Sequence, residues 1–221
     1  MAFSDFSKGQ RLDPSVFLNM EMEERALLTD DDIAGLDMTV YRALKKNDLT
    51  FMFKGCAGLK TPDLSRLNTI GVKRLDWMFA QCSNLRQLDL SGFDTSDVIC
   101  MTYMFDRCKS LNELNLESFD FSKVTDMYQM FTGCSELRRL IVSDTIRDAK
   151  VITRSTGSYE WTSTWGGAHS PSQADFAGTL ERVWVEEKKT IAFGDATRDE
   201  QFTYLGLEQR VEIVVVPLKR K

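Results

Sequence analysis

The sequence predicts an α/β solenoid in which one short strand and one helix recur with a 26-residue period. A phrase of the form Met-Phe-x-x-Cys occurs four times at this fixed spacing, beginning at Met52, Met78, Met104 and Met130. Each phrase is followed by the pattern L-x-x-L-x-L or a degraded form of it. A period in this range is typical of a solenoid, whose repeats bury their apolar faces only against their neighbours.

The end of each leucine pattern predicts a short strand. Apolar and polar residues alternate there with a period of two, so that Leu88 and Leu90 point inward while Gln87 and Asp89 point outward. The other pattern residues are Leu59, Pro62 and Leu64 in the first repeat, Leu85 in the second, Leu111, Leu114 and Leu116 in the third, and Leu137, Leu140 and Val142 in the fourth.

The segment before each strand predicts a helix, because its apolar residues follow a helical period. Val98, Met101, Met104, Phe105 and Cys108 lie at positions i, i+3, i+6, i+7 and i+10, which form one stripe of a helix. The equivalent stripes are Val72, Leu75, Met78, Phe79 and Cys82, and Val124, Met127, Met130, Phe131 and Cys134. One strand and one helix in each period make a leucine-rich-repeat unit, and we expect such repeats over residues 49–145.

Three strings of residues carry a more specific resemblance. They run from Met78 to Leu85, from Leu88 to Val98 and from Lys123 to Met127. Together they resemble the repeat of the BspA-type leucine-rich-repeat family of bacterial surface proteins. The resemblance implies a non-enzymatic interaction module, often adhesive and often displayed on a bacterial surface. It names no ligand, because function lies in exposed side chains rather than in the repeat itself.

Residues 1–48 are expected to form a helical N-terminal cap or attachment segment. Asp13-Pro14 supplies a helix cap followed by proline at the first helical position, which predicts a helix from Pro14 to about Leu28. Thr29–Asp32 then begins a second helix that runs towards Lys45. The Asp30–Asp32 carboxylates are interpreted as helix caps, because the segment lacks the spaced ligands and the glycine of a calcium loop.

The repeat is interrupted after residue 145. Residues 146–179 form an insertion rich in aromatic residues and glycine, after which Leu180, Val183 and Val185 reproduce the leucine pattern. The sequence therefore predicts a strand at Leu180 beside the strand of Leu140. Residues 180–221 are expected to contain closing strands and a basic tail, with Val211–Val216 as the edge strand.

Composition and charge exclude some classes of function. With 221 residues, 43% of them hydrophobic, the chain can bury one continuous core. A net charge of -5 argues against a dedicated nucleic-acid binder, which needs a basic surface. No stretch reaches the roughly 20 apolar residues of a membrane span, so membrane insertion is not expected.

The start of the chain bears on localisation. Met1–Lys8 has no basic n-region and no apolar segment, so it is not a secretory signal as it stands. We therefore expect synthesis in the cytoplasm and release as a structural or host-facing component of a phage or phage-like particle. The alternatives are a cell-surface adhesin whose signal has been removed and an intracellular scaffold.

The cysteines and the single histidine predict neither a metal site nor an enzyme. Cys56, Cys82, Cys108 and Cys134 hold one position in four repeats, which predicts a line of buried thiols rather than converging ligands. Cys100 lies off the apolar stripe and is expected to be an exposed free thiol. No nucleophile motif or phosphate loop accompanies the histidine, so we expect no catalytic residue, cofactor or metal.

Three groups of residues are candidates for interaction. The first group is the outward positions of the expected strands. The second group is Trp77 and Tyr103, which lie opposite the helix stripe. We expect these two rings to lie either under the N-terminal segment or in a subunit interface. Aromatic residues of the insertion are the third, as a glycan-binding tip or a small core. Expected partners are other subunits of an assembly, including copies of the chain, or a host-surface protein or glycan. The first group includes Gln87, Asp89, Glu113, Asn115 and Arg139, with Thr61, Asp63 and Ile141 beside them, and the third is Tyr159, Trp161 and Trp165.

Overall fold

The computed structural model of the chain describes residues 12–45, 47–153, 160–163, 180–183, 189–208 and 210–218. These fall into two compact units, one of Met1–Val151 with Ala192–Lys221 and one of Ile152–Ile191. In the second unit, β4 (Glu160–Ser163) pairs antiparallel with β5 (Leu180–Val183). Strands β3 (Lys150–Thr153) and β6 (Lys189–Ala192) form another two-stranded sheet.

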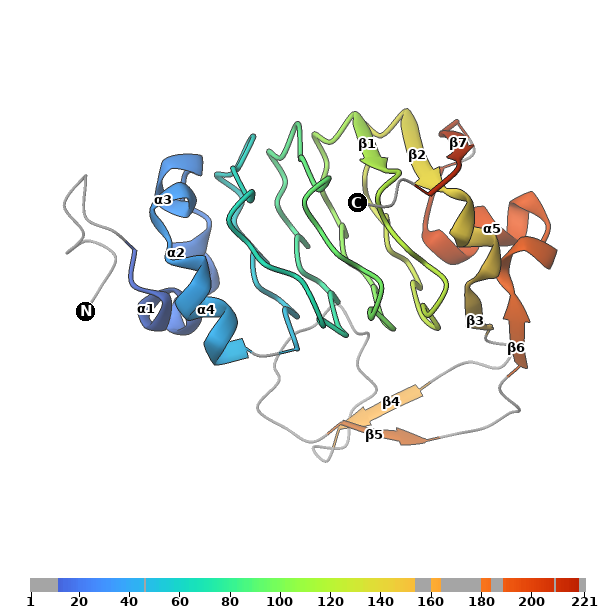
Figure 1. The fold of residues 1–221 in the computed structure, drawn as a ribbon, viewed down its shortest axis with the longest axis horizontal. Coiled ribbons are helices and arrows are strands. Elements are labelled where there is room, and N and C mark those ends of the chain that lie inside the picture. The colour runs from blue at the N-terminus through green and yellow to red at the C-terminus, as the bar shows by residue number, and fades with distance from the viewer. Residues whose placement is uncertain are drawn as a thin grey trace. The chain divides into compact units, whose positions relative to one another are not determined.

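The first unit contains a stack of coils of equal length, which Figure 1 shows side by side. Parallel bridges join Asp48 to Arg74, Arg74 to Cys100, and Cys100 to Asp126, so equivalent residues of successive coils lie next to one another. The last two coils also contribute β1 (Glu113–Leu116) and β2 (Arg139–Ser143) to a parallel sheet. Strand β7 (Glu212–Val216) pairs with β2 and gives the sheet order β1-β2-β7.

The prediction of a helix in each repeat is wrong, because no helix occurs among the described residues between α4 and β2. The Phe53 amide donates to the Met78 carbonyl of the next coil over 2.8 Å. The amide of the following residue, Lys54, instead donates to the Phe51 carbonyl of its own coil over 3.1 Å and closes a tight turn. This alternation recurs in the following coils. In an α-helix every amide would bond four residues back within its own segment. Here the neighbouring coil supplies half of the acceptors.

Left-handed backbone also separates these segments from helices. Trp77, Tyr103 and their equivalents in the other two coils have φ between 53° and 63°, a region that bulky residues rarely enter and that a right-handed helix cannot contain. The expected apolar stripe is nevertheless fully buried, from Val98 to Cys108. The spacing of the stripe predicted the inward residues correctly, but it predicted a helical backbone for them, which is wrong. Successive tight turns bring residues at this spacing to the same side of the chain, as a helix would. We call the surface formed by these turns the turn side of the stack.

A column of phenylalanines forms the centre of the core. The ring centroids of Phe53 and Phe79 are 5.3 Å apart, and each later pair, to Phe105 and Phe131, is 5.6 Å apart. Phe17, from the first helix, adds a further ring 6.1 Å from Phe53. Each stacked pair contributes about 0.5–1.5 kcal/mol beyond the area it buries. The column therefore ties the N-terminal helices to the coils.

Among the described residues before the coils there are four short helices rather than the two expected: α1 (Pro14–Asn19), α2 (Met22–Arg25), α3 (Asp30–Gly35) and α4 (Met38–Lys45). Asp13 is confirmed as the N-cap residue of α1, since its side chain accepts the Ser15 amide over 2.7 Å. The chain leaves α1 at Met20, whose backbone is extended and whose carbonyl accepts from Arg25 over 3.1 Å. That tertiary contact stops the helix where local sequence alone would continue it.

Side chains of this N-terminal segment form hydrogen bonds with backbone groups at the open end of the first coil. Asp30 accepts the amides of Lys60 and Thr61 over 2.9 and 3.0 Å. In the next coil the amide equivalent to that of Lys60, from Arg86, donates instead to the Lys60 carbonyl. The carboxylate thus takes the place of the carbonyl that a preceding coil would supply.

The other end of the stack is covered by η2 (Asp144–Asp148), η3 (Phe193–Asp195), α5 (Arg198–Leu205) and β7. The amides of Gln129 and Phe131 donate to carbonyls of Tyr204 and Leu205 at the end of α5. The strand beginning at Leu180 does not lie beside β2 as expected, because β7 takes that place. The apolar run of β7 suits a position beside the core better than the Leu-Glu-Arg-Val sequence of β5.

Candidate functional site

The outward face of the sheet carries a column of charged side chains. Arg139 lies in register between Glu113 of β1 and Glu212 of β7. Its Nη1 is 3.3 Å from Oε2 of Glu113, and its Nε is 3.5 Å from Oε2 of Glu212. Gln87, the equivalent residue one coil before Glu113, is exposed. Exposed ion pairs contribute about 0–1 kcal/mol each, so this column remains available to a partner.

The second outward column has a structural role over much of its length. The side-chain oxygens of Asp63, Asp89 and Asn115 each accept the backbone amide two residues further on, over 2.9 Å. Such bonds close a turn directly after a strand. Asp89 and Asn115, expected as interaction residues, therefore shape the turns that follow the outward face. The column ends in two half-buried apolar side chains, Ile141 and Val214, which lie opposite one another.

Trp77 and Tyr103 belong to a ladder of rings on the turn side. Trp77 is only 6% exposed, and its ring stacks on that of Tyr103 with the centroids 4.3 Å apart. On its other side lies Phe51, 6.3 Å away, and the ladder continues from Tyr103 to Tyr128 at 5.9 Å. These described ring neighbours come from adjacent coils. The ladder then reaches α5 through Tyr204, a residue that sequence reasoning did not single out.

Sequence reasoning also missed buried charges beside these rings. Lys54 is 6% exposed, and its Nζ lies 4.9 Å from the centroid of Trp77. Asp106, two coils further on at the same position, is also buried, and Ala80 separates the two. Burial lowers the pKa of Lys54 and raises the pKa of Asp106. The signal was present in the sequence, because the repeat spacing aligns Lys54, Ala80 and Asp106.

Cys100 is half-buried rather than exposed, which corrects the sequence expectation. Its Sγ donates to Oδ1 of Asp76 over 2.6 Å, and Arg74 lies 3.2 Å from the other oxygen of that carboxylate. Burial raises the pKa of Cys100 to about 12, with the Asp76 charge adding to the effect. Burial likewise raises the pKa of Asp76. The thiol therefore acts as a hydrogen-bond donor at neutral pH.

The other four cysteines form the expected line of buried free thiols. The Sγ atoms of Cys82, Cys108 and Cys134 each lie 3.1 Å from the carbonyl oxygen of a phenylalanine one coil earlier. Burial raises the pKa of each thiol, to about 12 in Cys134. Uncharged thiols of this kind serve packing rather than chemistry.

Part of the aromatic candidate group lies outside the described residues. Tyr159 and Trp165 are not described, and neither is the single histidine, His169. Trp161 lies in β4 opposite Arg182 of β5. A glycan-binding tip at these residues stays a prediction.

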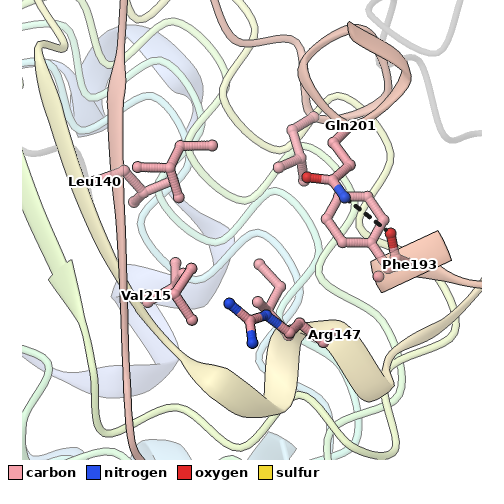
Figure 2. Close-up of a pocket in the computed structure, with 10 residues that line it drawn as sticks. Leu140, Arg147, Phe193, Gln201 and Val215 are labelled. Atoms are coloured by element: carbon pink, nitrogen blue, oxygen red, sulfur yellow. Dashed lines mark hydrogen bonds between the residues drawn. The ribbon is translucent and has the colours of Figure 1, made fainter. Parts of the chain in front are cut away.

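A pocket of about 250 Å³ lies between the last coil and the segments that cover it. Figure 2 shows Leu140 and Val215 on one side of it and Gln201 and Phe193 on the other, with Arg147 reaching in from η2. Its walls are mostly apolar, and nothing in the sequence alone pointed to it, because residues from 140 to 215 meet there. The remaining lining residues are Val142, Ile146, Gly194, Leu205 and Ile213.

Among the described residues there is no group of three or more histidine, cysteine, aspartate or glutamate side chains placed to hold a metal ion. None of the helices that the structure describes is long and apolar enough to cross a membrane.

Comparison with known proteins identifies a family for the chain. No curated protein and no solved structure matches the chain. A family model matches residues 47–158, which are 112 of the 221 residues and include all four coils. The chain therefore belongs to the family described as Mycoplasma protein of unknown function, DUF285.

Proposed function

We propose that the chain is a non-enzymatic protein-interaction module, built on a leucine-rich-repeat solenoid of the BspA type, whose outward sheet face binds a partner protein. The repeat assignment is supported by the bridging of equivalent residues in successive coils and by the burial of the leucine pattern, including Leu137, Leu140 and Val142. Stacked repeats of this kind present regular, extended surfaces.

The arrangement around Arg139 is the observation that carries the proposal. Arg139 lies between two carboxylates, and the adjacent column offers Ile141 and Val214, two half-buried apolar side chains in register. Protein interfaces typically combine an apolar centre with a polar rim. A partner with one apolar anchor and a basic residue directed at Glu113 or Glu212 would complement this surface.

Substitution at the apolar end tests the proposal. Partners cross-linked to the intact chain would be purified, and their affinity measured against Ile141→Glu. We expect a loss of at least tenfold, because a carboxylate would replace an apolar contact. Ile70→Glu is the matched control, since Ile70 is 67% exposed and lies outside this face. Equal loss in both variants, or none in Ile141→Glu, would place binding elsewhere.

The setting in which this surface acts is a second part of the proposal. We propose a structural or host-facing component of a phage or phage-like particle, with a bacterial cell-surface adhesin and an intracellular scaffold as alternatives. Antibody detection in purified particles, on intact washed cells and in cell lysate separates the three. Signal confined to lysate would reject both the particle and the surface.

A further inference from the structure

We propose that the pocket between the last coil and α5 binds a small amphipathic anion, an unbranched aliphatic chain that carries one carboxylate. The chain would lie among the apolar side chains, and the carboxylate would lie at Arg147. This site is separate from the outward sheet face, because it lies on the inner side of β2 and β7. Neither the sequence nor the family description assigns it.

The apolar wall is built by the pairing of two strands. Leu140 and Val142 of β2 stand in register with Ile213 and Val215 of β7, and all four line the pocket. Protein interiors are close-packed and contain few voids larger than a water molecule. A concave space of about 250 Å³ with such walls is therefore suited to an apolar occupant.

The polar groups of the lining determine where the head group lies. Nε2 of Gln201 donates to the carbonyls of Phe193 and Ala196, both over 3.0 Å, which uses both hydrogens of the amide. Gln201 therefore has no donor left for a ligand. Among the described lining residues, only Arg147 supplies a cation, so an anionic group would bind there.

Arg147 is exposed and well placed for this role. Its guanidinium extends towards Val215 at one side of the pocket. Within the described part of the chain, no carboxylate lies within ion-pair distance of it. Gly194 packs closely against the backbone of Arg147, because a β-carbon on Gly194 would lie 3.1 Å from both the Cβ and the carbonyl oxygen of Arg147. A guanidinium held beside an apolar space matches a carboxylate on an aliphatic chain in charge and in polarity.

Calorimetric titration of the full chain with butanoate, hexanoate and octanoate tests the inference. We expect saturable binding of octanoate and an affinity that rises about fourfold for each methylene added, which is the gain from burying one such group. Octanol, which has the same chain without the charge, should bind about tenfold more weakly than octanoate. Absence of saturable octanoate binding would overturn the proposal.

Three variants locate the site. Val215→Phe would fill the pocket while keeping a good strand residue, and it should abolish octanoate binding without lowering the melting temperature. Val214→Phe, on the opposite face of the same strand, should bind octanoate as the unchanged chain does. Arg147→Gln should bind octanoate and octanol about equally. Equal loss in both valine variants, or retained preference for octanoate in Arg147→Gln, would reject this pocket as the site.

An aliphatic chain beside an anionic group could come from a free carboxylic acid or from an anionic membrane lipid, in which a phosphate carries the charge. We infer the free molecule, because a pocket of this size encloses a single short chain. Co-sedimentation of the chain with anionic phosphatidylglycerol vesicles should be absent. Sedimentation that depends on Arg147 would overturn the assignment to a free ligand.

Discussion

The Nη1 atom of Arg25 lies 3.0 Å from the carbonyl oxygen of Met52, in the position where each later coil receives an amide from the coil before it. The equivalent carbonyl of Met78 accepts the Phe53 amide over 2.8 Å. Arg25 also donates to the carbonyls of Phe17 and Met20. One side chain therefore substitutes for a coil and joins α1 to the stack.

Arg25→Ala is expected to lower the free energy of unfolding by about 3 kcal/mol, because several carbonyls lose a charged donor. Urea unfolding followed by circular dichroism measures this. Arg86→Ala is the control, since Arg86 is exposed and its substitution should cost less than about 0.5 kcal/mol. Similar losses in the two variants would contradict the capping role of Arg25.

Gly206→Ala is expected to destabilise the cover of the last coil by about 2–4 kcal/mol. Gly206 ends α5 with φ of 69°, and a β-carbon there would collide with Oγ1 of Thr132 in the last coil. Both the strained backbone and the collision oppose alanine. Thermal unfolding would show the loss.

Gly92→Ala provides the comparison for that experiment. No atom lies within 4 Å of a β-carbon built on Gly92, and its φ lies outside the left-handed region. Alanine should therefore leave the melting temperature unchanged or raise it slightly, since it restricts the unfolded chain. A larger loss at Gly92 than at Gly206 would show that the close approach of α5 to the last coil is not what matters.

Trp77→Ala is expected to cost about 3–5 kcal/mol, because it removes a buried ring between Phe51 and Tyr103. Trp77→Phe should recover part of the loss. Light scattering across a concentration range should give the same mass for Trp77→Ala and the unchanged chain. A mass that falls only in the variant would instead place the ring in a subunit interface.

Cys100→Ala is expected to destabilise the chain more at about pH 8 than at about pH 4, by about 1–2 kcal/mol. Burial raises the pKa of Asp76 above its ordinary 3.8, and the Cys100 thiol partly offsets this. A carboxyl with a raised pKa contributes stability below 3.8, and that contribution is lost as the pH rises through its folded pKa. Removing the donor raises that pKa further and therefore increases the loss at high pH.

Cys108→Ala is the control for this pH dependence. Its thiol is also buried, but it donates to the Phe79 carbonyl, which does not titrate. The stability lost should therefore be nearly the same at both pH values. A pH-independent loss in Cys100→Ala as well would show that Asp76 does not respond to the thiol.

The repeat and its inward residues could be predicted from the sequence, because a fixed spacing reports which positions are equivalent. The stripe from Val98 to Cys108 is buried as expected. Its backbone could not be predicted, because the Phe53 amide bonds to the Met78 carbonyl in the next coil and no local pattern records that choice. For the same reason α1 ends at Asn19, where Arg25 holds the following residue in extended backbone.

The candidate sites were less predictable than the fold. Alternation correctly placed Glu113 and Asn115 outward, but it could not show that the Asn115 oxygen already binds the amide of Glu117. The pocket joins Leu140 to Val215, and the strand expected beside β2 was the wrong one. A site assembled by that pairing was therefore beyond sequence reasoning.

The two ends of the stack would be complementary to each other if they were uncovered. At the first coil the Met52 carbonyl needs a donor and the Lys60 amide needs an acceptor, whereas at the last coil the Phe131 amide needs an acceptor. The Glu212 amide donates to the Arg138 carbonyl, which would otherwise need a donor. Bare ends of this kind could join head to tail without closing, and such contacts produce filaments. The helices at one end and β7 with α5 at the other occupy these backbone groups, so that none of them is left for a second copy of the chain.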